Sequence, residues 1–210
     1  MLNIISHRGY WLDPKEKNTK IAFSRALSYG FGIETDFRDL NGQLVVSHDI
    51  PLVGAMAASE FVALYRSCPV TAPLALNIKS DGLQHLVDQF IQDAGFQACF
   101  VFDMAVPDMY AYIGLGVPTY TRLSEYETVP SLLSSCQGVW LDAFESTWYD
   151  LGVINPILAQ GKGIAIVSPE LHGRSYLELW QWLKMNKLHE QSLVSLCTDF
   201  PMQAQEFFDA

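Results

Sequence analysis

Short apolar runs alternate with segments of helical spacing along the whole chain. Apolar runs of about 4–8 residues bounded by turns are typical of buried strands, whereas apolar residues three and four positions apart are typical of helices. The expected strands are 2–6, 31–37, 74–78, 98–102, 117–121, 138–141, 164–167 and 193–196. The helical patterns are 21–29, 61–65, 83–94, 109–114, 129–135, 148–159, 176–185 and 202–208.

This alternation predicts a parallel sheet with helices outside it. Eight strand–helix repeats in 210 residues predict an α/β fold, a small (β/α)8 TIM barrel, as one domain spanning 1–210. Asn41-Gly42 is a hairpin signal, so residues 43–47 are expected to extend the second strand. A doubly wound open sheet is the alternative, because the pattern alone does not show closure.

Composition and charge exclude several classes of function. The chain has 23 acidic residues against 13 Lys and Arg, a formal net charge of -10, which is the opposite of a phosphate-tracking nucleic-acid surface. No apolar run approaches the ~20 residues of a membrane helix, and the first residues lack a basic leader and a cleavage site. We therefore expect a cytoplasmic protein without membrane insertion, whose anionic substrate is drawn by a local positive site or a metal.

Polar residues stand where the expected strands end, which is where a barrel builds its active site. His7 and Arg8 follow the first strand, and His48 ends the hairpin strand. Glu34 and Asp36 are two residues apart, so both point to the same face of the second strand. The third strand ends with Asn77 and Lys79, and the later strands are followed by Asp103, Arg122, Asp142, Glu170, His172 and Asp199.

These polar residues also have structural interpretations. A single Asp after a strand is more often a helix cap, which is the role expected for Asp199. For His172 two interpretations stay open: a loop residue whose hydrogen bonds are made within the loop, or a residue of the site. His85 and His189 fall in helical stretches and are expected at the surface or in packing.

The Glu34/Asp36 pair needs a different explanation. Two carboxylates buried side by side repel each other unless a cation or a proton intervenes. A divalent metal is the simplest relief, and hard oxygen ligands favour Mg2+ or Ca2+ over zinc. We therefore expect one divalent cation at Glu34 and Asp36.

Five motifs in order resemble the signature of the glycerophosphodiester phosphodiesterase family. That family has H-R-G, E-N-T, E-x-D and H-D in sequence, with a closing T-D-x-P. The match is dense over 7–49, weaker over 74–79, and returns at 198–201. The residues that carry it are His7-Arg8-Gly9, Asn18-Thr19, Glu34-Thr35-Asp36, His48-Asp49 and Thr198-Asp199-Phe200-Pro201.

The resemblance implies a barrel of the PLC-like phosphodiesterase type that uses a divalent cation to hydrolyse a glycerol-type phosphodiester. It implies that His7 and His48 divide the roles of general acid and base, in either order. Arg8 and Lys79 suit the phosphate oxygens, Arg8 as a planar fork of donors and Lys79 as a point charge. A neighbouring substrate hydroxyl is a possible first nucleophile, which would give a cyclic phosphate.

The chain departs from the family pattern at the third strand. The family's E-x-K is Asn77-Ile78-Lys79 here, so a metal-ligating carboxylate becomes an amide. We expect Asn77 to offer its carbonyl oxygen to a more weakly bound metal, or a different ligand set that includes Asp103, Asp142 or Glu170.

The family's inserted domain after this strand is also missing, which implies a more open mouth. The polar loops after the later strands therefore suggest a larger substrate, such as a sugar-linked phosphodiester. The residues in these loops expected to bind it are Arg122, Glu170 and His172.

Two other functions fit the same residues. One is a catalytically weakened barrel that binds a phosphodiester without cleaving it. The other is a lyase-type phospholipase, against which the missing signal peptide and docking stretch argue. The released alcohol and the oligomeric state stay open.

Overall fold

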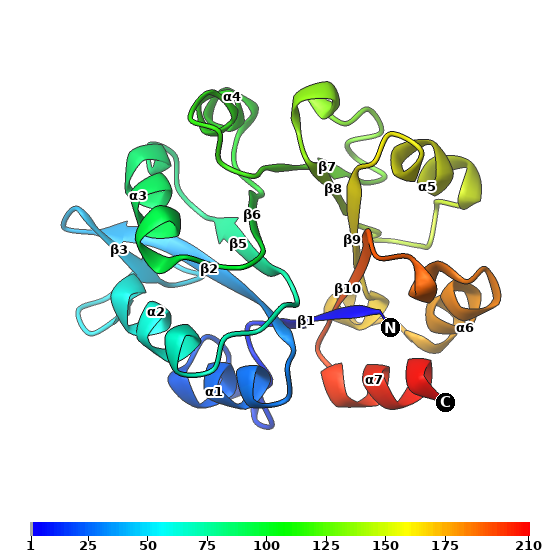
Figure 1. Cartoon of the computed structure of the whole chain (residues 1–210), viewed down its shortest axis with the longest axis horizontal. Helices are drawn as coiled ribbons and strands as arrows, with labels where there is room; N and C mark the ends of the chain where they lie inside the picture. The colour runs from blue at the N-terminus through cyan, green and yellow to red at the C-terminus, as the bar shows by residue number, and fades with distance from the viewer. Residues whose placement is uncertain (1) are drawn as a thin grey trace.

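A ring of parallel strands forms the centre of the molecule, in a computed structural model that describes residues 2–210. Strand β1 pairs with β2 on one side and with β10 on the other, so the first and last strands are neighbours (Figure 1). The strands are β1 (Asn3–His7), β2 (Gly32–Leu40), β5 (Leu74–Ile78), β6 (Cys99–Phe102), β7 (Tyr120–Leu123), β8 (Gly138–Leu141), β9 (Gly163–Val167) and β10 (Val194–Thr198).

Two runs of ladders make up the ring. One joins β1, β2, β5 and β6, and the other joins β1, β10, β9, β8 and β7. The two runs meet at one parallel bridge between Val101 in β6 and Thr119, the residue before β7. The amide of Val101 also donates a hydrogen bond to the carbonyl of Pro118, at 2.8 Å. The (β/α)8 barrel predicted from the pattern is the fold of the chain.

The helices lie outside the strands (Figure 1). The α-helices are α1 (Lys20–Ser28), α2 (Ala58–Ser67), α3 (Gln84–Ala94), α4 (Val106–Gly114), α5 (Leu151–Leu158), α6 (Leu177–Met185) and α7 (Pro201–Asp209). The short 3-10 helices are η1 (Pro14–Glu16), η2 (Leu133–Ser135), η3 (Pro169–His172) and η4 (Leu188–Glu190).

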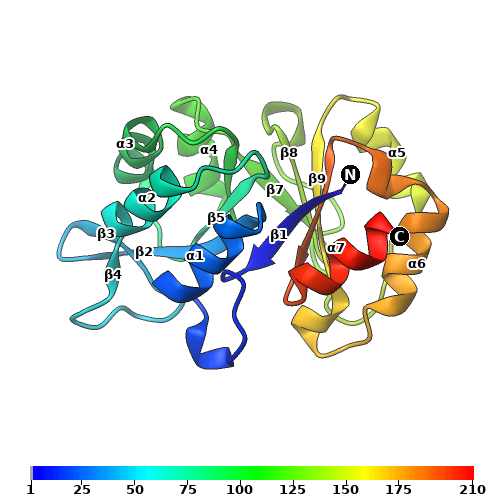
Figure 2. The same ribbon diagram turned by 60° about the horizontal axis from the view of Figure 1, so that its bottom comes forward.

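A hairpin extends the second strand beyond the ring. Asn41 and Gly42 both have positive φ, 53° and 78°, as a tight hairpin turn requires. Strand β3 (Gln43–Val46) returns antiparallel to β2, and β4 (Met56–Ala57) pairs antiparallel with β3. Figure 2 shows this hairpin extending to one side of the molecule. The loop from β3 to β4 carries His48, so the hairpin brings a residue distant from β1 to the same end of the ring.

Three local predictions differ from the structure. The helix expected at 129–135 is only the 3-10 turn η2, because Pro130 and the left-handed Leu132, with φ of 55°, interrupt it. The strand expected at 117–121 lies at 120–123, and β4 was not expected. Thr19 is the N-cap of α1, and its side chain accepts a hydrogen bond from the amide of Ala22.

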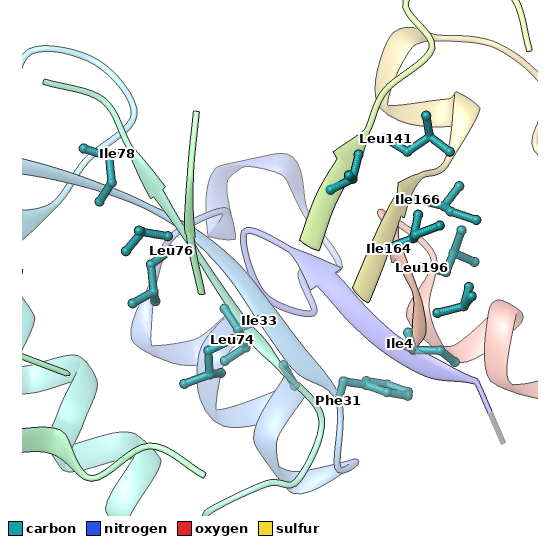
Figure 3. Close-up of a cluster of buried hydrophobic side chains, with 14 of the residues drawn as sticks. Ile4, Phe31, Ile33, Leu74, Leu76, Ile78, Leu141, Ile164, Ile166 and Leu196 are labelled. Carbon is teal, nitrogen blue, oxygen red and sulfur yellow. The ribbon is translucent and has the colours of Figure 1, made fainter. Parts of the chain in front are cut away.

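The apolar core has two parts. One lies between strands and helices, where alternate strand residues such as Ile33, Leu76 and Ile164 point outward (Figure 3). The other fills the inside of the ring, where Phe102 stacks on Trp140 with ring centroids 3.9 Å apart. This filling makes the barrel a packed core whose free space is at its ends. No helix formed by residues 2–210 combines the length and hydropathy needed to cross a bilayer.

Candidate active site

His7 forms a dyad with Asp199 at the carboxyl ends of β1 and β10. The Nδ1 atom of His7 lies 2.6 Å from Oδ1 of Asp199, so Nδ1–H donates to the carboxylate and Nε2 stays free. Burial lowers the pKa of His7 below its ordinary value, although the hydrogen bond and charge of Asp199 work to raise it. The imidazole is therefore neutral near pH 7 and carries its lone pair on Nε2.

Asp199 stays ionised beside this neutral imidazole. Burial works to raise the pKa of Asp199, but the hydrogen bond from His7 and the ammonium of Lys17 outweigh it, so the pKa is lowered. The Nζ atom of Lys17 lies 3.5 Å from Oδ2 of Asp199. A fixed carboxylate behind a neutral histidine is the arrangement that orients a general base.

The free nitrogen of His7 faces Glu34. Its Nε2 atom is 3.9 Å from Oε2 of Glu34, and the two residues are register partners in the β1–β2 ladder. Arg8 turns the chain out of β1 with a left-handed φ of 58°. In that conformation its amide donates to the backbone carbonyl of Glu34, at 2.9 Å, and to Oε2, at 3.3 Å. The turn after β1 thus fixes His7, Arg8 and Glu34 together.

Glu34 and Asp36 are both almost completely buried, at 2% and 0% exposure. Burial, and next the negative charge of Asp36, raises the pKa of Glu34 well above its ordinary value. Asp36 lies between two cations, with Arg8 Nε at 3.3 Å from Oδ2 and Lys79 Nζ at 3.5 Å from Oδ1. The two cations compensate the charge of Asp36, but an ionised Glu34 would still need a further positive charge nearby.

Two asparagines hold these carboxylates in place. Asn18 has a left-handed φ of 59°, and its Nδ2 donates to Oδ2 of Asp36 at 2.8 Å. Asn77 is the register partner of Asp36, and its Nδ2 donates to Oε1 of Glu34 at 3.2 Å. The Oδ1 atoms of Asp36 and Asn77 are buried and accept no hydrogen bond.

The Oδ1 atoms of Asp36 and Asn77 show whether the expected metal site has suitable ligands. A carboxylate oxygen and an amide oxygen without donors, next to a Glu whose pKa is raised, are the hard donors that Mg2+ or Ca2+ prefers. The donor set therefore fits one hard cation. Within residues 2–210, no three His, Cys, Asp or Glu side chains gather as metal ligands, consistent with an amide at position 77. The alternative ligands Asp103, Asp142 and Glu170 are each occupied by partners described below.

A chain of charges continues from Asp36 along the rim. Lys79 bridges Asp36 and Asp103, and its Nζ is 3.2 Å from Oδ2 of Asp103. Asp103, with a left-handed φ of 73°, also binds Nη1 of Arg122 at 2.5 Å. Arg122 in turn pairs with Glu127. The ends of β2, β5, β6 and β7 are thereby joined by alternating charges.

His48 lies at the open side of the site. Its Nδ1 is 2.9 Å from Oδ1 of Asp49, but the side chains of His48 and Asp49 are 43% and 93% exposed. The His7 side chain, by contrast, is only 15% exposed. The hairpin thus brings His48 to the pocket mouth, where protein contacts hold it less firmly.

One pocket of about 270 Å³ connects these groups. Another part of its wall follows β8 and β9, where Asp142, Phe144 and His172 lie. The expected site residues that line the pocket are His7, Arg8, Glu34, His48, Asn77, Lys79, Arg122 and His172. Asp36 lies directly behind them, in contact with Arg8 and Lys79.

Glu170 does not line this pocket. Its Oε1 accepts hydrogen bonds from the hydroxyl of Thr198 and from the amide of Asp199, the latter at 3.1 Å, and Oε2 binds the hydroxyl of Ser168. The expectation that Glu170 contacts substrate is therefore corrected: Glu170 supports the turn that carries Asp199.

The capping role expected of Asp199 is also wrong, because Phe200 is the N-cap of α7 and Asp199 binds His7. A signal for this existed, since the last strand of a closed barrel must lie beside the first. Asn18 belongs to one of the family motifs, but nothing in its local sequence points to a hydrogen bond with Asp36. Its role depends on a left-handed backbone that the sequence pattern does not reveal.

Solved structures with this architecture include several phosphodiesterases. The chain aligns over 99% of its length with 99% of a glycerophosphodiester phosphodiesterase from Agrobacterium tumefaciens, with TM-score 0.68 and 18% identity. A glycerophosphoryl diester phosphodiesterase from Parabacteroides distasonis gives TM-score 0.67 and 16% identity over 99% of this chain and 86% of that one. The fold is that of the PLC-like phosphodiesterases.

A more distant likeness is to a Ca2+-dependent phosphatidylinositol-specific phospholipase C from Streptomyces antibioticus. It covers 99% of this chain and 96% of that one, with TM-score 0.57 and 12% identity. No protein-family model and no curated protein sequence matches the chain at a significant level. These likenesses therefore establish the fold.

Proposed function

We propose that this protein hydrolyses a phosphodiester to an alcohol and a phosphomonoester. The observation that carries the proposal is one pocket that combines an oriented, neutral histidine, the cations Arg8 and Lys79, and buried Glu34 with Asp36 directly behind it. A phosphodiester is an anion, so a nucleophile approaches it only when its charge is neutralised. The pocket offers that neutralisation within a chain of net charge -10.

Arg8 and Lys79 are the phosphate-binding groups in this proposal. Both contact Asp36, which holds their charges at the ends of β1 and β5. Arg8 Nε is buried and makes no hydrogen bond that meets ordinary geometry. The guanidinium and the ammonium therefore have donor capacity left for the oxygens of a phosphate.

His7 acts as the general base. Its Nδ1–H is held by Asp199, and its Nε2 takes the proton of a substrate hydroxyl or a water. His48, from the open side of the same pocket, is the second imidazole expected from the resemblance. A neighbouring substrate hydroxyl as nucleophile gives a cyclic phosphate, which water then opens.

One divalent cation, Mg2+ or Ca2+, completes the site in this proposal. Glu34, Asp36 and the amide oxygen of Asn77 would hold it, and when bound it supplies positive charge next to the phosphate. Asn77→Glu restores a third carboxylate and should tighten this binding. Calorimetric titration with Mg2+ and Ca2+ measures it, and equal affinities in wild type and variant would remove position 77 from the ligand set.

The substrate class follows from the part of the pocket wall at the ends of β7, β8 and β9. Arg122, His172 and Phe144 line it, so polar and aromatic groups face the alcohol part of the substrate. This wall suits a glycerophosphodiester whose alcohol carries hydroxyls, or a sugar-linked phosphodiester. Faster turnover of glycerophosphocholine than of sugar-linked and polyol-linked diesters would count against that choice.

A binding protein without turnover is the second candidate, favoured by the amide at Asn77. A lyase-type phospholipase is a third reading, and it would stop at the cyclic phosphate. Calorimetry with a nonhydrolysable phosphodiester, paired with a turnover assay on the cleavable one, separates the candidates. Tight binding with no product indicates the binding protein, and accumulation of cyclic phosphate indicates the lyase.

A further inference from the structure

A second histidine–carboxylate pair lies in the same pocket as His7. His172 ends η3, after β9, and its Nε2 is 2.7 Å from Oδ1 of Asp142, the residue that follows β8. Asp142 is buried at 6% exposure, and the same oxygen accepts the amide of Ala143 at 2.8 Å. The carboxylate is thus fixed, and it fixes the ring of His172.

The geometry of this pair defines which nitrogen of His172 serves a substrate. Nε2–H donates to Asp142, which leaves Nδ1 as the nitrogen for the pocket. The Phe144 ring packs beside the imidazole, with centroids 4.8 Å apart, and restricts its rotation. When His172 carries both protons, Nε2–H stays with Asp142 and the transferable proton is the one on Nδ1.

His172 is held more firmly than His48. The side chains of His172 and Asp142 are 23% and 9% exposed, whereas those of His48 and Asp49 are 43% and 93% exposed. A proton donor works best when it is held against the atom that it protonates. His172 meets this requirement better than His48 does.

The two dyads line the same pocket from different parts of the ring. His7 comes from β1, beside Arg8 and Glu34, whereas His172 follows β9, two strands further round the ring. In the proposed reaction Arg8 and Lys79 hold the phosphate, and His7 takes the proton of the nucleophile. The leaving alcohol needs a second imidazole of the same pocket, and His172 is the one that a buried carboxylate holds.

We propose that His172, held by Asp142, is the general acid that protonates the leaving alcohol; this inference rests on the proposed function. In the step, the attacking hydroxyl gives its proton to Nε2 of His7 as its oxygen bonds to phosphorus. The phosphorus–oxygen bond to the alcohol breaks, and that oxygen takes the proton from Nδ1 of His172. Solvent then returns a proton to His172 and removes one from His7.

Two glycerol phosphodiesters that differ only in the leaving alcohol test this role. One releases p-nitrophenol, which leaves as a stable anion without a proton, and the other releases an unactivated primary alcohol. Loss of a general acid typically costs ~10^2 to 10^4 in rate. His172→Ala should lose that factor on the alkyl ester and less than about tenfold on the p-nitrophenyl ester, whereas His48→Ala should lower both rates by equal factors.

His172→Gln separates catalysis from a structural link between the two loops. Its amide keeps a donor for Asp142 but cannot give up a proton, so a structural role predicts restored turnover of the alkyl ester. The inference predicts that the loss remains in this variant. His85→Ala, an exposed histidine of α3, is the matched control, with both rates and the melting temperature unchanged.

Equal losses on both esters in His172→Ala, no loss on either, or rescue by His172→Gln would overturn the inference and leave the proposed function standing. A selective loss on the alkyl ester in His48→Ala would also overturn it, since it would assign the proton to that residue. A wild-type protein that cleaves neither ester would overturn the proposed function itself, and the inference with it.

Discussion

Two features of its environment determine the protonation of His7: burial and the hydrogen bond to Asp199. Burial favours the neutral ring and lowers the pKa, while Asp199 fixes which nitrogen keeps the proton. Trp11 adds a further constraint, since its indole N–H donates to the carbonyl of His7 at 3.2 Å. The His7 ring is therefore neutral and oriented at neutral pH, as the proposed role of general base requires.

Asp199→Asn should change both the rate and its pH dependence. The substitution removes a charge that raises the pKa of His7, so that pKa should fall further below 6.5. Because the base must be neutral to act, the acid limb of kcat/KM should move to lower pH. Its plateau should fall by roughly 10^2- to 10^4-fold as the ring loses its orientation.

Rate profiles of wild type and variant from pH 4 to 9 measure both effects, provided that the protein stays folded across that range. An acid limb that stays in place, or moves to higher pH, would contradict this account of the dyad.

Glu34 links stability to pH through its raised pKa. In cation-free protein the folded state keeps the Glu34 proton to higher pH than the unfolded state does. The Glu34 contribution is therefore complete below the ordinary value of 4.5 and is lost as pH rises through the raised pKa. Glu34→Gln, which cannot ionise, should gain melting temperature relative to wild type as pH rises.

Melting curves in chelator, at pH 5 and pH 8.5, measure this difference, at roughly 2–4 °C per kcal/mol for a chain of this size. Mg2+ or Ca2+ should raise the wild-type melting temperature and leave Glu34→Gln almost unchanged. If the melting temperatures of wild type and Glu34→Gln differ by the same amount at both pH values, the folded protein does not raise the pKa of Glu34.

Among the elements, β7, β8 and β9 depend on how closely Tyr120 approaches two glycines. The Tyr120 ring stacks on Phe100 with centroids 3.7 Å apart, inside the barrel. A Cβ at Gly138 would lie 2.4 Å from this ring and 2.5 Å from the carbonyl oxygen of Gly163. The β8–β9 ladder therefore has no room for a side chain at this level.

Gly138→Ala should destabilise the protein, since the clash includes backbone as well as a side chain. Overpacking of a tight core typically costs ~1–3 kcal/mol, which corresponds here to a melting temperature lower by roughly 2–12 °C. The matched control is Gly114→Ala at the end of α4, where a Cβ meets nothing within 4 Å. If both variants melt together, the close approach of Tyr120 is not a determinant of stability.

The sequence predicted elements well where apolar periodicity decided them. Residues 138–141 were expected as a strand and form one. Periodicity failed at 129–135, because a repeat of apolar residues cannot overcome Pro130 and the left-handed Leu132 beside it. Strand β4 was missed because two residues paired to a hairpin leave no pattern of their own.

At the scale of the molecule, closure of the ring determines which distant residues of the site come into contact. The end of β10 lies beside the start of the chain only because the strands return to β1. That adjacency creates the His7–Asp199 dyad from residues 192 positions apart. Likewise, Asp142 and His172 meet because β8 and β9 are neighbours. The motifs predicted the participants near the N-terminus, but these two pairings required the closed barrel.

The distribution of charge also has meaning only for the whole molecule. The chain is acidic overall, yet four of its cations gather at one end of the barrel: Arg8, Lys17, Lys79 and Arg122. Each is held by a carboxylate, so the site keeps its cations in place without being strongly positive. This arrangement favours a small anion that enters the pocket over a long polyanion that lies on the surface.

The most direct test of the account is to identify the products that purified wild type and His7→Ala form from a glycerophosphodiester, by phosphorus NMR with added Mg2+ or Ca2+. We expect a phosphomonoester signal from wild type, with or without a transient cyclic phosphate. The folded His7→Ala protein should react at least roughly a hundredfold more slowly. No conversion of any glycerol- or sugar-linked diester by wild type, or equal conversion by His7→Ala, would contradict it.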